Sequence, residues 1–167
     1  MAEIYLAGGC FWGMEKAIQA LNGVLETTAG YANGTVEHPS YEQVCTDTTG
    51  HRETVRVVYD PEKLSLNKIL KAYFICIHPE QYHRQGNDFG SQYQSGVYYT
   101  DEESGKICEV YFAEEKTKHD AFYTELAPLA CFYEAEEYHQ DYLIRNPGGY
   151  CHISGDEYEQ VKQLNEE

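Results

Sequence analysis

Basic residues are scarce in this sequence. Lys and Arg together number 12 against 28 Asp and Glu, which leaves a formal net charge of −16 at pH 7. A field of that sign repels phosphate backbones and anionic lipid surfaces. Long hydrophobic runs are absent as well, because the longest uncharged apolar run, Ala72–Ile77, is far below the ~20 residues of a membrane-spanning helix. We therefore expect neither nucleic acid nor a membrane as a partner.

The spacings typical of metal and phosphate sites are also missing. There is no Cys-x-x-Cys, no His-Glu-x-x-His and no acidic calcium loop, so we expect no zinc or calcium site. Gly8-Gly9 precedes a helical pattern, but the lysine and the serine or threonine of a nucleotide-binding loop do not follow it. The sequence predicts a protein without a bound metal or cofactor.

The cysteines do not have the pattern of a disulfide frame. All six are widely separated, at positions 10, 45, 76, 108, 131 and 151, and a frame is typical of short secreted chains. The first residues, Met1–Tyr5, contain neither a basic region nor a long apolar stretch, so we expect no secretory signal. These observations predict a cytoplasmic protein with mostly reduced thiols.

What is present indicates one folded domain over residues 1–167. The chain is 42% apolar and contains 16 Tyr, which is enough to build one core at this length. The hydrophobic patterns predict strands at 4–7, 24–31, 54–59, 96–99 and 122–129, and helices at 10–21, 41–45, 66–77, 101–119 and 134–145. We expect residues 80–95 to form a long loop and residues 146–151 an irregular C-terminal tail. Alternating strands and helices predict a two-layer α/β fold with a mixed sheet.

Cys10 is the most informative residue. It follows two glycines at the predicted start of a helix, where free backbone N–H groups and the positive end of the helix dipole favour a thiolate. A buried cysteine in a turn is an equally good interpretation of the position alone. Phe11 and Trp12 follow directly, and two rings beside a reactive thiol can form the wall of an apolar pocket as well as part of the core.

Other candidate residues are ambiguous when taken singly. Glu53 lies at the start of a predicted strand, where a carboxylate is usually solvated; burial beside aromatic rings would raise its pKa and let it donate a proton. Asp88 has the surroundings of a turn residue, and His139 those of a histidine on a helix surface. Composition does not distinguish any of the 16 Tyr from the others.

Together, however, several segments resemble the peptide methionine sulfoxide reductase A family in order along nearly the whole chain. The segments are Gly8–Gly13, Gly30-Tyr31, Pro39–Cys45, Thr49–Glu53, Gln85–Ser95 and Phe132–Gln140. The resemblance implies a fold related to the ferredoxin-like type and an enzyme that reduces the S epimer of methionine sulfoxide, free or in oxidised proteins that it repairs under oxidative stress.

The resemblance also implies roles for residues near the thiol. Cys10 matches the nucleophile of the family, and Phe11 and Trp12 match the aromatic pair that holds the methyl group of the substrate. Glu53 matches the acid that protonates the sulfoxide oxygen. Because a sulfoxide sulfur is a poor electrophile until its oxygen takes a proton, an acid and a thiol nucleophile must act together. We expect replacement of Glu53 by Gln to slow the reaction most at higher pH.

Four further residues match supporting positions. Tyr41 and Tyr93 match phenols that steady the sulfoxide oxygen, Asp88 matches a carboxylate of the surrounding hydrogen-bond network in substrate binding, and His139 matches a residue that supports the others without contacting substrate. Gln94 stands where the family often has arginine.

The recycling of the thiol completes the expected cycle. Oxygen transfer leaves a sulfenic acid on Cys10, which a second thiol can attack to form a disulfide. Cys151 is the choice for this thiol because it lies in the glycine-rich stretch Gly148–His152; no cysteine follows it, so a relay through a third cysteine is not expected. The disulfide then needs an external dithiol, and thioredoxin is the usual reductant of the family. We expect a monomer.

Two alternatives remain open at this point. Cys10 with His139 and a carboxylate is also a plausible arrangement for a cysteine hydrolase, which would turn over esters or amides without a reductant. A non-catalytic acidic interaction domain, in which Cys10 only packs, is the other.

Overall fold

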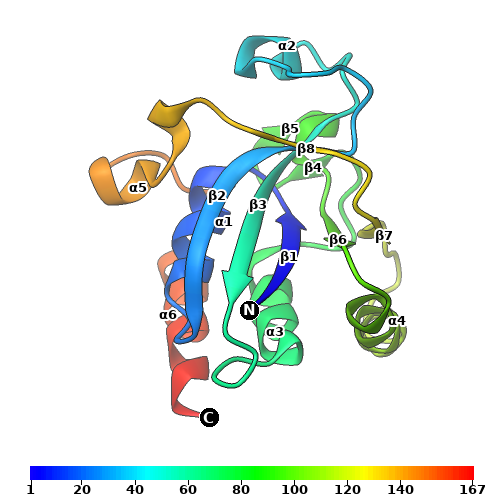
Figure 1. The fold of residues 1–167 in the computed structure, drawn as a ribbon, viewed down its shortest axis with the longest axis vertical. Helices are drawn as coiled ribbons and strands as arrows, with labels where there is room; N and C mark the ends of the chain where they lie inside the picture. The colour runs from blue at the N-terminus through cyan, green and yellow to red at the C-terminus, as the bar shows by residue number, and fades with distance from the viewer.

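The computed structural model describes residues 1–167 and contains one six-stranded mixed sheet (Figure 1). Its strands are β1 (Ala2–Ala7), β2 (Val24–Ala32), β3 (Arg52–Tyr59), β6 (Gly96–Tyr99), β7 (Glu125–Pro128) and β8 (Phe132–Glu134), in the spatial order β7-β6-β1-β3-β2-β8. All neighbours are antiparallel except β6 and β7, which are parallel. A separate two-residue hairpin pairs β4 (Arg84–Gln85) with β5 (Asp88–Phe89).

The helices follow the strands in an order that defines the fold. They are α1 (Phe11–Gln19), α2 (Tyr41–Cys45), α3 (Leu66–Cys76), α4 (Glu102–Lys116), α5 (Tyr142–Arg145) and α6 (Gly155–Gln163). Short 3₁₀ turns lie at Ser91–Tyr93, Glu137–His139 and Leu164–Glu166. The succession β1-α1-β2-β3-α3-β6 with the sheet order β6-β1-β3-β2 is the ferredoxin-like arrangement. The expected two-layer α/β fold is confirmed.

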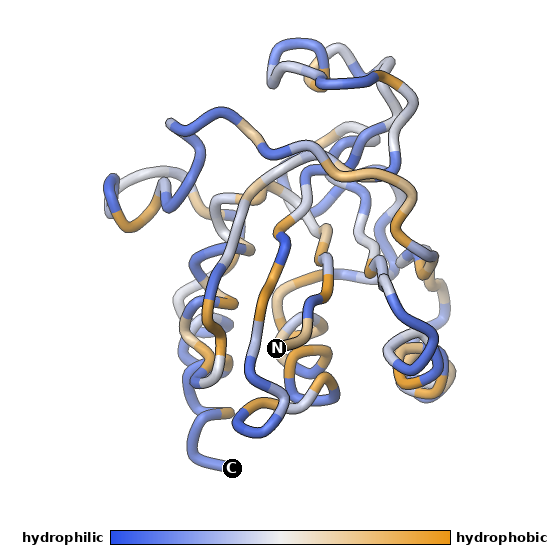
Figure 2. Tube along the Cα trace, in the orientation of Figure 1, coloured by the Kyte–Doolittle hydropathy of each residue, from blue (hydrophilic) through white to orange (hydrophobic).

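The two faces of the sheet differ in what covers them. On one face a core of 29 buried residues joins inward side chains such as Leu6 and Val57 to α1, α3, α4 and α6. On the other face a cluster of four buried residues, among them Tyr5 and Tyr98, packs under Phe132 and its neighbours. Apolar and polar stretches accordingly alternate along the central strands (Figure 2). No helix is long and apolar enough to cross a membrane.

Helix starts are fixed locally by side-chain caps. Ser65 accepts a hydrogen bond from Lys68 N, and Asp101 accepts one from Ser104 N. The short α2 begins with a capping box between Ser40 and Gln43. Each cap depends on residues that are close together in the sequence. For this reason the predicted positions of α2, α3 and α4 agree with the structure to within a few residues.

Two C-terminal expectations need correction. Residues 134–145 do not form one helix: Glu134 ends β8, a 3₁₀ turn follows, and α5 is one turn long. Helix formation is interrupted because Asp141 has φ +52° and because the Gln140 side chain pairs with the main chain of Ala29. Residues 146–151 are irregular as expected, but after Ser154 the chain forms α6, which packs on α3 and α1.

Candidate active site

Cys10 occupies the N-cap position of α1. The turn between β1 and α1 depends on Gly9, whose φ of +74° is in the region that favours glycine. Cys10 is 7% exposed, and its side chain makes no capping hydrogen bond. Its main-chain N–H instead donates to Asp88 Oδ2 on β5 at 3.4 Å. The thiol is therefore placed by main-chain geometry at the end of the sheet, where α2 and the β4–β5 hairpin also gather (Figure 1).

Glu53 is the buried acid beside this thiol. It is 1% exposed, and its Oε1 accepts a hydrogen bond from Phe11 N at 3.2 Å while its Oε2 accepts one from Gln92 Nε2 at 2.8 Å. Burial raises the pKa of Glu53 to about 8, against the opposing effect of these two hydrogen bonds. At neutral pH the carboxyl group is thus mostly protonated and able to donate.

The ionisation of Cys10 differs from the expectation drawn from its helix position. Burial raises the pKa of Cys10 well above its ordinary value, the Glu53 carboxylate raises it further, and a hydrogen bond from the main chain of Trp12 opposes both. The helix N-terminus is therefore outweighed by burial. Protonation of Glu53 removes the second of these effects, so acid and nucleophile are electrostatically linked.

Aromatic side chains surround the first turn of α1. Phe11 is buried, with its ring 5.8 Å from the Tyr31 ring. Trp12 is partly exposed and stacks on Tyr142 of α5, with centroids 3.7 Å apart and planes at 11°. The predicted aromatic wall thus has a third member from the C-terminal segment.

His139 orients this wall. Its Nδ1 accepts a hydrogen bond from the Trp12 indole at 3.0 Å, and its ring lies 4.5 Å from the Tyr41 ring. Burial lowers the pKa of His139, so the ring is neutral at pH 7 with its proton on Nε2, which has no partner. No hydrogen bond joins His139 to Cys10, and the geometry of a cysteine–histidine hydrolase pair is absent.

Tyr41 and Tyr93 lie within the electrostatic reach of Glu53. Burial is the main cause that raises the pKa of both phenols, and the Glu53 carboxylate is the next. Both hydroxyls therefore stay protonated and can donate hydrogen bonds. Tyr41 is placed by Glu136, whose Oε2 accepts from Tyr41 N and whose Oε1 accepts from Tyr31 Oη.

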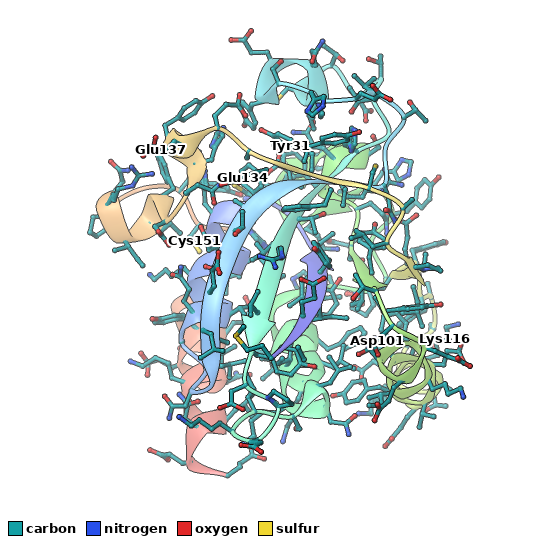
Figure 3. All side chains as sticks on the ribbon, viewed as in Figure 1. Tyr31, Asp101, Lys116, Glu134, Glu137 and Cys151 are labelled. Carbon is teal, nitrogen blue, oxygen red and sulfur yellow. The ribbon has the colours of Figure 1, made fainter.

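Cys151 lies against the first turn of α1. A Cβ added to Gly13 would be 3.1 Å from Cys151 Sγ, and the thiol donates to Ile153 O at 3.5 Å. Figure 3 shows Cys151 beside α1. The irregular segment before α6 thus brings the second thiol to the helix that begins after Cys10.

Asp88 connects the hairpin to both thiol-bearing segments. Besides Cys10 N, it accepts a hydrogen bond at Oδ1 from Tyr150 Oη at 2.9 Å. Tyr150 directly precedes Cys151, so one carboxylate contacts the segments of both cysteines.

Three site residues were not found by sequence reasoning: Gln92, which holds Glu53; Glu136, which holds Tyr41; and Tyr142, which stacks on Trp12. All lie inside or next to segments singled out for the resemblance, but no local signal distinguishes them from neighbouring polar or aromatic residues. Gln94, which stands where the family often has arginine, connects two loops: its side chain accepts a hydrogen bond from His83 N and donates one to Tyr123 O.

The remaining cysteines are free thiols. Cys76 and Cys108 are buried in helices as packed side chains, which agrees with their predicted helical positions. Cys45 is exposed and accepts a hydrogen bond from Gln92 Nε2 at 3.5 Å, and Cys131 donates to Gly34 O. No group of three or more His, Cys, Asp or Glu side chains is arranged to hold a metal ion.

This arrangement defines a class of protein before any comparison. A buried thiol, a neighbouring acid that is protonated at neutral pH, a cluster of aromatic side chains and a second nearby thiol form the site of a thiol-dependent oxidoreductase. Comparison with known proteins then gives the family.

The family model described as "Peptide methionine sulfoxide reductase" matches residues 2–167. "Peptide methionine sulfoxide reductase MsrA" of Clostridium botulinum (strain Hall) is 49% identical over 154 residues, covering 92% of this chain and 98% of that protein. The protein of the same name from Mycoplasma genitalium is 46% identical, covering 93% and 100%. The chain belongs to the peptide methionine sulfoxide reductase A family and reduces methionine sulfoxide in a thiol-dependent reaction.

Solved structures agree with the fold. Mxr1 from Saccharomyces cerevisiae in reduced form superposes with a TM-score of 0.86 at 33% identity, covering 91% of this chain and 90% of that one. Methionine sulfoxide reductase A of Corynebacterium diphtheriae superposes with a TM-score of 0.80 at 36% identity, covering 90% and 77%. Yeast Mxr1 has also been solved in complex with Trx2. The family assignment overturns the hydrolase and the non-catalytic alternatives.

Proposed function

We propose that this enzyme reduces the S epimer of methionine sulfoxide, with Cys10 as nucleophile and Glu53 as acid. The observation that carries the proposal is a buried acid next to the Cys10 thiol. The pKa of Glu53 is raised to about 8, and its carboxyl group accepts a hydrogen bond from Phe11 N, the first N–H of the helix whose N-cap is Cys10. A protonated acid beside a thiol is what sulfoxide reduction requires.

Substrate binding follows from the wall around Cys10. The methyl group of the substrate packs against Phe11 and Trp12, and the sulfoxide oxygen is directed to Glu53. The neutral phenols of Tyr41 and Tyr93 donate to the same oxygen, and Asp88 holds the main chain of Cys10. An apolar pocket with a few converging donors suits a neutral sulfoxide.

The first chemical step moves one oxygen atom. The Cys10 sulfur attacks the sulfoxide sulfur and forms a transient S–S bond as Glu53 protonates the oxygen. The oxygen then moves to the Cys10 sulfur: the S–O bond of the substrate and the transient S–S bond break, and the S–O bond of the Cys10 sulfenic acid forms. The thiol proton of Cys10 restores the proton that Glu53 gave. The sulfide product is methionine, and Cys10 is the group that is oxidised.

The second step regenerates a reducible enzyme. The Cys151 thiol attacks the Cys10 sulfenic acid, the two sulfurs form a disulfide, and water leaves. Thioredoxin, or a dithiol like it, then reduces the disulfide by thiol exchange. The existence of a complex between yeast Mxr1 and Trx2 supports this choice of reductant. We further propose a monomer formed by one domain over residues 1–167, acting in the cytoplasm where thioredoxin systems keep thiols reduced.

The preference for one epimer is tested first, with dithiothreitol as the reductant so that recycling by thioredoxin is not required. The protein is incubated with each separated sulfoxide epimer and dithiothreitol, and methionine is measured. We expect turnover of the S epimer, none of the R epimer, and none with Cys10→Ser; turnover of the R epimer or a fully active Cys10→Ser would refute the proposal.

Recycling is then measured with thioredoxin and its reductase in place of dithiothreitol. Cys151→Ser should release about one equivalent of methionine and stop, because its sulfenic acid has no resolving thiol. Cys131→Ser, at another partly exposed thiol, is the matched control and should turn over like the wild type. Sustained thioredoxin-driven turnover by Cys151→Ser would exclude Cys151 as the resolving residue.

A further inference from the structure

His152 is a buried histidine without hydrogen-bond partners. Its side chain is 4% exposed, and neither Nδ1 nor Nε2 has a partner within hydrogen-bond distance. An unpaired buried polar group costs free energy, and in native proteins such groups are rare. His152 directly follows Cys151, so the two side chains share one short segment.

The His152 ring lies over the start of α1, on the two glycines that flank the Cys10 turn. A Cβ added to Gly9 would be 2.6 Å from His152 Nε2, and one added to Gly13 would be 3.1 Å from His152 Nδ1. A side chain at position 9 would overlap the ring, and one at position 13 would crowd it. The fold therefore holds an imidazole beside the residue that becomes a sulfenic acid.

The imidazole also lies beside the resolving thiol. The same point above Gly13 that is 3.1 Å from His152 Nδ1 is 3.1 Å from Cys151 Sγ. Both atoms thus lie on the same side of the first turn of α1. In this structure the Cys151 thiol donates a weak hydrogen bond to Ile153 O and not to the imidazole. Transfer of its proton to His152 therefore requires Cys151 to move toward Cys10.

Three charged or titratable groups face the ring from neighbouring elements. Asp88 Oδ2 of β5 is 3.9 Å from Nδ1, Glu157 comes from α6, and His78 comes from the segment after α3. Burial is the largest effect and lowers the pKa of His152; the two carboxylates and a contact with the main chain of Gly8 raise it, and His78 lowers it. The ring is therefore a neutral base at pH 7, and Asp88 is placed to stabilise the imidazolium when it forms.

We propose that His152 accepts the thiol proton of Cys151 as Cys151 attacks the Cys10 sulfenic acid, and passes that proton to the departing hydroxide. The S–H bond of Cys151 and the S–O bond of Cys10 break, the S–S bond forms, and the hydroxide leaves as water. No oxidant is needed beyond the sulfenic acid already present, and His152 ends unchanged. The inference rests on the proposed function and assigns a proton-transfer residue to its second step.

The experiment measures the two steps separately in a single turnover with the S epimer. Methionine release reports the first step. Loss of dimedone-reactive Cys10, followed by mass spectrometry at timed intervals, reports disulfide formation. In His152→Gln we expect disulfide formation to slow roughly tenfold to a hundredfold relative to methionine release. His119→Gln, after the end of α4 at a histidine that pairs with Glu80 and Glu115, is the control and should match the wild type.

A pH profile distinguishes proton transfer from packing. Wild-type disulfide formation should be constant at neutral and higher pH and fall only in the acidic range, as the imidazole, whose pKa is lowered by burial, becomes charged. In His152→Gln the rate should instead rise continuously with pH, because hydroxide or buffer must then remove the thiol proton that the imidazole accepts in the wild type. In His152→Ala, which opens a cavity at the ring, added imidazole should restore the rate in proportion to its neutral form.

The outcomes separate this inference from the proposed function. If the wild type releases no methionine, the proposed function fails. If the wild type releases methionine and forms the disulfide, but His152→Gln keeps the same rate and pH profile, His152 only packs and the inference is overturned. Slow disulfide formation in His152→Ala without rescue by imidazole would overturn it as well.

Discussion

Glu53, the acid of the proposed mechanism, is buried, and under that proposal its pKa sets the pH dependence of the first step. With a pKa of about 8, the group is protonated through the neutral range and loses its proton above it. We expect the wild-type rate of single-turnover methionine release to be high below pH 8 and to fall as pH rises through 8. Glu53→Gln should be slower by roughly 10²-fold or more at pH 7, with little dependence on pH near 8.

The raised pKa of Glu53 reverses the expectation from the sequence that Glu53→Gln would slow the reaction most at higher pH. The difference between wild type and Glu53→Gln should be largest below pH 8 and narrow above it, because the wild-type acid itself is then ionised. Glu114→Gln, at an exposed position on α4, controls for loss of charge. A Glu53→Gln enzyme that retains the wild-type rate at pH 7 is incompatible with Glu53 as the acid.

The same carboxyl group links stability to pH. Because its pKa is raised from 4.5 to about 8 on folding, the folded state binds its proton more tightly than the unfolded state. The contribution of Glu53 to stability is fully present below pH 4.5 and is lost as pH rises to 8. Relative to Glu53→Gln, the free energy of unfolding of the wild type should fall by roughly 2–4 kcal/mol between pH 4.5 and 8.5. Urea denaturation at several pH values measures this, and parallel curves for the two proteins would show that Glu53 does not titrate in that range.

For single residues, the sequence was sufficient to find the Cys10 thiol but not the side chains that surround it. Gly8-Gly9 before an apolar helical pattern was enough to predict Cys10 at a helix start, and the structure places it at the N-cap. The resemblance pointed to Glu53, since a glutamate at the start of a strand gives no local sign of burial. Gln92 and Tyr142 escaped because their roles depend on contacts with residues 39 and 130 positions away along the chain.

At the scale of elements, a buried glutamate in α1 holds the segment that carries α5. Glu15 is 1% exposed; its Oε2 accepts from Thr27 Oγ1 and its Oε1 accepts from Asp141 N, both at 2.9 Å. Asp141 has a positive φ and directly precedes Tyr142, which stacks on Trp12. Glu15 therefore positions part of the aromatic wall that we propose binds the substrate, without contacting the substrate itself.

Removal of this anchor should affect binding more than chemistry. Glu15→Ala leaves the Thr27 hydroxyl and the Asp141 N–H without an acceptor, which costs about 1–3 kcal/mol of folding stability. As Tyr142 loosens, KM for methionine sulfoxide should rise several-fold while kcat stays within about twofold of the wild type. Glu15→Gln keeps one acceptor oxygen, so its stability and KM should lie between those of the wild type and Glu15→Ala. Unchanged KM in a destabilised Glu15→Ala would show that α5 does not depend on this anchor.

The C-terminal elements show where local patterns stop being sufficient. For α6 the capping box between Ser154 and Glu157 was present in the sequence, and Val161 and Leu164 supply its buried side; the helix was not predicted because its apolar side is short and gives only a weak hydrophobic pattern. The break in the predicted 134–145 helix could not be read locally. Glu136 and Gln140 pair there with Tyr31 and Ala29 of β2, and those tertiary hydrogen bonds replace helical ones.

At the scale of the whole molecule, the net charge of −16 should act on charged substrates even though the proposed site suits a neutral group. Exposed acidic residues lie on two segments next to the aromatic side chains of that site: Glu42 and Asp47 in and after α2, and Glu134 and Glu137 around β8. Figure 3 shows Glu134 and Glu137 at the same end of the molecule as Tyr31. A negative rim attracts basic peptides and repels acidic ones over roughly a Debye length.

The expected consequence is a preference among protein substrates that salt removes. A peptide with methionine sulfoxide between lysines should have a kcat/KM several-fold higher than the same peptide with glutamates at an ionic strength of about 0.01 M, where the Debye length is about 30 Å. At about 0.15 M, where it is about 8 Å, the ratio should fall toward one. N-acetyl methionine sulfoxide amide carries no net charge and serves as the control, since its kcat/KM should not depend on salt. Equal values for the two peptides at low salt would mean that the rim does not reach the bound substrate, whereas a ratio that persists at high salt would point to direct side-chain contacts instead of the long-range field.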